Sequence, residues 1–141
     1  MNDEVRLVIP SILDPLSADA VGYFGRQLKA HEALWPHLKV MGIVGTLTNK
    51  AQRAEEEPLL RRAGDRLRAA LEGTSGRLRY VEGQNTRFEF PYECSIRRST
   101  PMARAANQGV PYVSIGNNNA GRAVRAMFDS FGKEVERRWP L

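Results

Sequence analysis

The sequence predicts an α/β fold in which a mostly parallel, doubly wound sheet carries helices on both faces. Short apolar runs, which are typical of buried strands, alternate with longer segments whose apolar residues recur at helical spacing. This alternating order favours parallel strands joined by right-handed helical crossovers. The 141 residues are enough for a single domain over 1–141, and the sequence contains no repeat, linker or low-complexity tract.

The first unit of this pattern opens the chain. Residues 5–10 (VRLVIP) form a short apolar run that ends at proline, which is typical of a buried parallel strand. A helix is expected from about residue 17 to 33, with Ser17 as its N-cap and Asp19 in its first turn. Pro36 ends this region because proline interrupts helical hydrogen bonding.

The second unit begins at residues 40–44 (VMGIV), which predict another buried strand with a polar end at 45–49. A helix is expected from about residue 56 to 72, and residues 73–76 are its stop signal. One apolar face of this helix is formed by Leu60, Ala63, Leu67 and Leu71.

Two shorter units follow. Residues 87–92 (RFEFPY) predict a short strand. A compact helix is expected over 101–108, because a capping threonine precedes it, proline suits its first position and Gly109 follows its end. Residues 111–115 (PYVSI) predict a further strand.

The last helix has the clearest pattern, and it follows Asn119, its expected N-cap. Two ion pairs at i,i+4 spacing, Asp129 with Lys133 and Glu134 with Arg138, are expected on its solvent side. Its continuous apolar stripe consists of Ala120, Val124, Met127, Phe128, Phe131, Val135 and Trp139.

Composition excludes several classes of protein. There is no apolar run of membrane-spanning length and no signal-peptide pattern, so we expect a cytoplasmic protein. The single cysteine, Cys94, excludes an internal disulfide, and one cysteine with two histidines makes no zinc cluster.

The net charge of +5 arises after Gln52, where the sequence has 16 basic and 11 acidic residues. This excess indicates either an anionic partner such as DNA or a solvated, arginine-rich surface.

The carboxyl ends of parallel strands are where open sheets gather ligands. In this chain those ends are expected at residues 10–14, 46–49, 92–98 and 114–118, which hold small polar residues, two arginines and few acids. This set suits an anionic or nucleotide-like ligand, and turn formation is the alternative interpretation of each residue.

Known catalytic motifs are missing from the sequence. There is no GxxxxGK[ST] phosphate loop, because the single Gly-Lys pair, Gly132-Lys133, is followed by glutamate within the last helix. There is no GxSxG elbow. Cys94 with His31 or His37 would be a conceivable catalytic pair, but a passive thiol and surface histidines are the preferred interpretation. We therefore predict no catalytic residue.

Four segments together resemble the ParA/MinD-type (CobQ/CobB/MinD/ParA) P-loop partition ATPases. Residues 3–10 (DEVRLVIP), with 14–17 (DPLS) and a helix, are similar to the family's strand ending in "IP" after its second nucleotide motif. Residues 41–49 (MGIVGTLTN) resemble its "LGVVLT" strand. Residues 96–111 (IRRSTPMARAANQGVP) match, without gaps, a segment where a short helix ends in glycine and proline opens the next strand. The charged last helix resembles the family's end, so the resemblance spans nearly the whole chain.

The resemblance implies the carboxyl-terminal half of a P-loop NTPase-like fold. The family's phosphate loop, magnesium-binding acids and water-positioning aspartate all lie upstream of the matched region. By the match, Asn49 lies at the strand end near the nucleotide base, Arg97 and Arg98 occupy the family's "PR" pair, and Pro111 is its later proline. Arg97 replaces the family's proline, and Pro91, which falls several residues earlier, is the alternative candidate for that part.

The resemblance also implies partners. Arg104, Arg137 and Arg138 are the candidates for a DNA-facing surface. The intact family member would bind ATP and magnesium, dimerise and work with a ParB-like or other partner protein. We expect this chain alone to bind neither cofactor tightly.

Two functions follow as alternatives. The first is the carboxyl-terminal half of an ATPase that positions DNA or other cellular cargo, inactive by itself because it lacks the phosphate loop and metal site. The second is a non-enzymatic module that keeps half of the fold for protein or DNA contacts. A half-sheet exposes a strand edge and an apolar helix face, so a dimer or larger assembly is expected.

Overall fold

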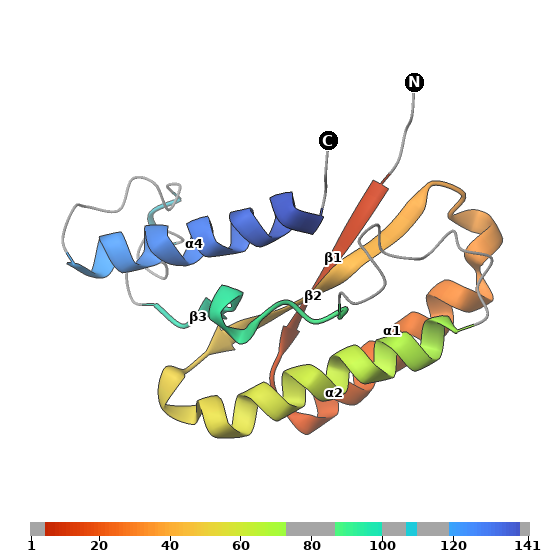
Figure 1. Cartoon of the computed structure of the whole chain (residues 1–141), viewed down its shortest axis with the longest axis horizontal. Helices are drawn as coiled ribbons and strands as arrows, with labels where there is room; N and C mark the ends of the chain where they lie inside the picture. Colours follow the sequence, from red (N-terminus) through yellow and green to blue (C-terminus); the bar gives the residue numbers. More distant parts are fainter. Residues whose placement is uncertain (1–4, 73–86, 100–106, 110–118, 139–141) are drawn as a thin grey trace.

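A computed structural model describes residues 5–72, 87–99, 107–109 and 119–138 (Figure 1). Within these residues three parallel strands form one sheet in the order β1-β2-β3, so the predicted α/β class with a parallel sheet is confirmed. The elements are β1 (Val5–Ile12), α1 (Pro15–Ala30), η1 (Glu32–Leu34), β2 (Leu38–Thr48), η2 (Lys50–Gln52), α2 (Arg53–Leu71), η3 (Tyr92–Cys94), β3 (Ile96–Arg97) and α4 (Asn119–Arg138).

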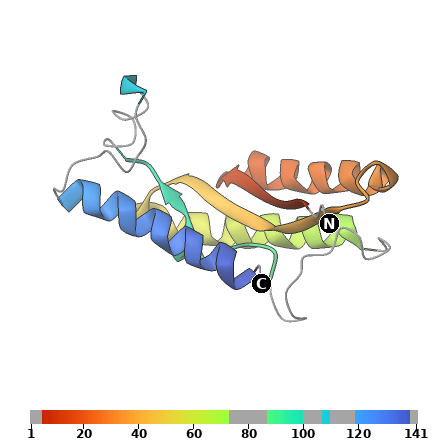
Figure 2. The ribbon, with the colours of Figure 1, turned by 90° about the horizontal axis from the view of Figure 1, so that it is seen from above.

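Helices cover both faces of the sheet, as predicted (Figures 1 and 2). The side chains of β2 alternate between the two faces except at an irregularity, where Leu7 pairs with Val40 but Val8 pairs with Gly42, so residues three apart across this point share a face. Val40 and Ile43 belong to the core under α1 and α2, with Leu28, Leu60 and Leu67. Met41 and Val44 belong to a second core with Phe90 and Cys94, against which Phe131 and Val135 of α4 pack. Burial on both faces explains why β2 reads as a continuous apolar run.

The N-terminus of α1 differs from the prediction. The cap is Asp14, whose Oδ1 accepts a hydrogen bond of 2.7 Å from the Ser17 main-chain N–H, so the assignment of Ser17 as cap is wrong. Pro15 fits the first position because a helix needs no N–H donor there. The helix ends at Ala30 and is followed by η1.

The third strand is shorter than predicted and lies later in the chain. Residues 87–92 contribute only an isolated parallel bridge between Glu89 and Ile43. Ile43 donates to the Phe88 carbonyl at 2.9 Å and accepts from the Phe90 N–H at 2.7 Å. The chain then passes through Pro91 into η3, and β3 follows at Ile96–Arg97.

Most of the next predicted elements lie outside the described residues. Of the helix expected over 101–108, residues 107 and 108 are described and helical. Gly109 has a φ of +68°, the left-handed conformation expected of a glycine that follows a helix. The strand expected over 111–115, including Pro111, lies outside the described residues, as does Arg104.

At the carboxyl end of α4, the predicted solvent-exposed ion pair is wrong. Glu134 and Arg138, expected on the solvent side, are only 7% and 3% exposed. They form a buried ion pair of 3.2 Å between α4 and the sheet. Among the described residues, none of the helices has the length and apolar character needed to cross a bilayer.

Candidate functional site

The parallel sheet brings three of the sequence-predicted site residues to one edge. The carboxyl ends of β2 and β3 are adjacent, with Thr48 opposite Arg97 and the Arg98 N–H donating to the Thr48 carbonyl at 3.1 Å. Asn49 directly follows Thr48. We call the residues Asn49, Arg97 and Arg98 the carboxyl edge, and all three are at least partly accessible to solvent.

Asn49 is held by hydrogen bonds from both sides of its turn. Its Oδ1 accepts from the Ala51 N–H at 3.0 Å and so caps η2, while its own N–H donates to Glu56 Oε1 at 3.0 Å. The Tyr92 hydroxyl donates to the same Glu56 oxygen at 2.7 Å and lies 3.2 Å from the Asn49 carbonyl. Glu56 and Tyr92 are both buried, so they fix the turn that presents Asn49.

The Tyr92 phenol remains protonated at neutral pH. Burial, followed by the hydrogen bond to Glu56 and the charge of that carboxylate, raises the pKa of Tyr92 to about 12. Arg53 lies over its ring, 5.0 Å from the centroid, and acts in the opposite direction. Tyr92 is therefore a hydrogen-bond donor that positions the turn, and its phenol does not ionise near neutral pH.

The same end of β2 contains a strained residue that sequence reasoning missed. Leu47 has a φ of +55°, in the left-handed region that costs a bulky side chain free energy. Leu47 is 46% exposed, so burial compensates for this strain only in part. Outliers of this kind cluster at functional sites. Nothing in the sequence marks this residue, because left-handed backbone is expected at glycine or asparagine.

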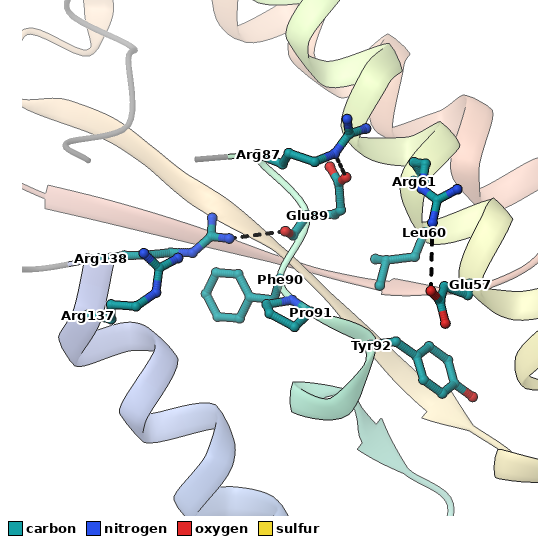
Figure 3. Close-up of a pocket in the computed structure, with 10 residues that line it drawn as sticks. All are labelled: Glu57, Leu60, Arg61, Arg87, Glu89, Phe90, Pro91, Tyr92, Arg137 and Arg138. Carbon is teal, nitrogen blue, oxygen red and sulfur yellow. Dashed lines mark hydrogen bonds and ion pairs between the residues drawn. The ribbon is translucent and has the colours of Figure 1, made fainter. Parts of the chain in front are cut away.

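A pocket of about 370 Å³ lies between α2, residues 87–92 and the end of α4 (Figure 3). We call it the arginine pocket. Its lining has four guanidinium groups, two carboxylates and an apolar part, and consists of Glu57, Leu60, Arg61, Arg87, Glu89, Phe90, Pro91, Tyr92, Arg137 and Arg138. No motif in the sequence predicted it, because its residues come from three separate segments.

Arg138 forms the inner wall of this pocket. Its Nη1 donates to the carbonyls of Met41 at 3.0 Å and Phe88 at 3.1 Å, and its Nη2 donates to the Glu89 carbonyl at 3.0 Å. The guanidinium also lies 4.4 Å from the centroid of the Phe90 ring. Burial lowers the pKa of Arg138, and its hydrogen bond to Glu134 opposes that effect. A guanidinium committed to these partners does not fit the DNA-facing role expected from the sequence.

Close approach to Arg138 depends on a glycine in β2. A Cβ at Gly42 would lie 2.4 Å from the Phe88 carbonyl oxygen and 2.7 Å from Arg138 Nη1. Both distances are shorter than real Cβ contacts allow, so only glycine leaves room for these groups at this position.

Arg137, the neighbouring candidate, is accessible. Its side chain is 52% exposed and donates through Nε and Nη2 to Glu134 at 2.6–3.0 Å. Burial alone would raise the pKa of Glu134, but the hydrogen bonds from Arg137 and Arg138 outweigh it and keep the pKa below its usual value. Arg137 is thus a surface guanidinium held in a defined orientation.

Nucleophilic and metal chemistry find little support in the described residues. Cys94 is buried, and this burial raises the pKa of its thiol, which disfavours the reactive thiolate. His31 and His37 are exposed. Across the described ranges, no group of three histidine, cysteine or acidic side chains is placed to hold a metal ion.

Comparisons with protein-family models, with curated proteins and with solved structures find no match to this chain. The resemblance to partition ATPases therefore remains a prediction from its four sequence segments.

Proposed function

We propose that this chain is the carboxyl-terminal half of a ParA/MinD-like ATPase and that its carboxyl edge contacts the base side of the bound nucleotide. One observation carries the proposal: Asn49, Arg97 and Arg98, chosen from the sequence, lie together at the carboxyl ends of parallel strands. This is where open α/β sheets bind nucleotides.

The contribution of the chain is recognition rather than chemistry. The Asn49 amide and the two guanidiniums offer hydrogen-bond donors suited to a base and its sugar. ATP and magnesium are the cofactors of the proposed intact protein, in which the metal would stabilise charge on the transferred phosphoryl group. The described residues do not fit a magnesium site, so we assign no metal ligand in this chain.

ATP binding measured by equilibrium dialysis tests the proposal. In the variant Asn49→Asp the carboxylate still caps η2, but the amide donor is lost and a negative charge is added. We expect weak ATP binding that falls about tenfold in this variant, which corresponds to about 1.4 kcal/mol. The matched control is Asn107→Asp at another exposed asparagine. Equal losses in both variants, or magnesium-dependent hydrolysis by the chain alone, would contradict the proposal.

A specific observation favours a second function, self-association. Beside β1, which pairs only with β2 among the described residues, apolar side chains are exposed: Ile12 by 46%, Leu16 by 82% and Phe24 by 41%. The charged Asp19 of α1 is directed to Arg62 and Arg66 of α2. We propose that a second copy covers this group of exposed apolar side chains. Sedimentation should show a dimer that Leu16→Glu dissociates, and a monomer at millimolar concentration would contradict this proposal.

A further inference from the structure

The arginine pocket offers a binding chemistry separate from the carboxyl edge. None of Asn49, Arg97 and Arg98 lines it. Its four arginines and two glutamates give the lining a formal charge of +2 (4 − 2). Three of these arginines, Arg61, Arg87 and Arg137, have side chains that are 58%, 50% and 52% exposed. A ligand in the pocket can therefore reach guanidinium groups from α2, from residues 87–92 and from α4.

We propose that the arginine pocket binds a small phosphate monoester, in which a phosphate dianion is attached to an apolar body. Guanidinium groups present several N–H donors in a planar fork that matches phosphate oxygens. Among the apolar residues of the lining, Pro91 is exposed and provides a surface for the body of such a ligand, while the buried side chains of Leu60 and Phe90 lie behind it. The volume of about 370 Å³ falls in the range of small-molecule pockets.

Existing ion pairs orient two of the arginines before any ligand arrives. Arg87 pairs with Glu89 and donates to Asp65 at 2.8 Å, while Arg137 is forked onto Glu134. The Arg87 guanidinium has five N–H donors, and these two pairs engage its Nε and one of its Nη atoms. Such preorganisation lowers the entropy lost on binding. Arg61 lies 3.7 Å from Glu57, beyond hydrogen-bond range, and can turn toward an anion at small cost.

The distribution of acids favours a compact anion over duplex DNA. Glu57 and Glu89 are part of the lining, and Asp65 lies beside Arg87 with its side chain 64% exposed. A polyanion that crosses this surface would meet these carboxylates together with the arginines, whereas a single phosphate group can contact the guanidiniums alone. Affinity for DNA depends on many phosphate contacts in series, which this pocket does not provide.

Nuclear magnetic resonance titration of the ¹⁵N-labelled chain with phenyl phosphate tests the proposal. We expect the arginine Nε–Hε signals of Arg61, Arg87 and Arg137 to shift. The variants Arg61→Gln and Arg137→Gln should each weaken binding about five- to tenfold, because each removes a charged donor. The matched control is Arg68→Gln, which changes an exposed arginine of α2 outside the lining and should leave the affinity unchanged.

Three outcomes would overturn the proposal. The first is equal affinity for phenyl phosphate in Arg61→Gln and Arg68→Gln. The second is equal affinity for inorganic phosphate and phenyl phosphate, because the apolar lining would then contribute nothing. The third is displacement of phenyl phosphate by stoichiometric duplex DNA with the same dependence on Arg61, which would assign the pocket to nucleic acid. The titration follows the signals of these arginines alone. A negative result with phenyl phosphate would therefore overturn the phosphate proposal without affecting the nucleotide proposal, which is tested by ATP binding at Asn49.

Discussion

Arg138 Nη1 donates a hydrogen bond of 3.0 Å to the main-chain carbonyl of Met41, although 97 positions separate the two residues in the chain. The same guanidinium reaches the carbonyls of Phe88 and Glu89. These carbonyls lie where residues 88–90 run beside β2 as a bridge rather than a full strand. Arg138 thus supplies donors to carbonyls of this irregular sheet edge and anchors the end of α4 to it.

Replacing this arginine should destabilise the fold strongly. Arg138→Met retains an unbranched apolar stem but removes every donor and leaves buried Glu134 with one partner fewer. We expect a loss of about 3–5 kcal/mol in the free energy of unfolding, measured by urea denaturation. Arg137→Met, at the exposed neighbour, should cost less than about 1 kcal/mol. Similar losses in both variants would show that the buried contacts of Arg138 contribute little.

The glycine beside Arg138 gives a second test. In Gly42→Ala the new Cβ would collide with the Phe88 carbonyl, and we expect a destabilisation of about 1–3 kcal/mol. The control is Gly132→Ala in α4, where no atom beyond the neighbouring residues and the backbone of the helix itself lies within 4 Å of the added carbon. That variant should be more stable by about 0.5–1 kcal/mol, because alanine favours a helix. Thermal unfolding of both variants measures the contrast, and a neutral Gly42→Ala would refute the close packing.

The raised pKa of Tyr92 predicts that the folded state loses stability at high pH. Its pKa is about 12 in the folded state, above the value of about 10 expected when unfolded. The unfolded state therefore loses this proton first, and the stabilisation that is complete below pH 10 declines until about pH 12, by about 1.4 kcal/mol per pH unit.

Tyr92→Phe removes both the hydrogen bond to Glu56 and this titration. We expect the variant to be less stable than the native chain by about 1.5–3 kcal/mol at pH 7. The difference should shrink between pH 10 and pH 12, as measured by urea denaturation across that range. A constant difference would mean that the Tyr92 pKa is unshifted.

Backbone strain at Leu47 predicts a stabilising substitution. Leu47→Gly removes the steric cost of a φ of +55°, and we expect a gain of about 1 kcal/mol. Leu34→Gly, at another exposed leucine, should give no gain, because Leu34 has no positive φ. Differential scanning calorimetry compares the two melting temperatures. A loss of stability in Leu47→Gly would show that the side chain makes contacts that outweigh the strain.

Sequence patterns predicted the layers of this fold because they depend on local periodicity. The apolar run at β2 and the helical spacing in α2 each specify which residues are buried. The strand-end position of Asn49 followed from the same pattern. The helix cap was missed because Asp14 and Ser17 are both good capping residues, and only the preference of proline for the first helical turn separates them.

Neither the arginine pocket nor the role of Arg138 could be predicted from the sequence, and the reason is physical. The partners of Arg138 are main-chain carbonyls, which every residue has, and they are brought near by the packing of α4 on the sheet. By local spacing alone, Glu134 and Arg138 read as an ordinary exposed i,i+4 pair.

The most direct test of the nucleotide proposal is a map of the amide signals that shift when ATP is added to the ¹⁵N-labelled chain. We predict that the largest shifts belong to Asn49, Arg97 and Arg98, and that Asn49→Asp reduces them. Shifts confined to Arg61, Arg87 and Arg137, or no shift at millimolar ATP, would contradict the assignment of the carboxyl edge as the base-side nucleotide site.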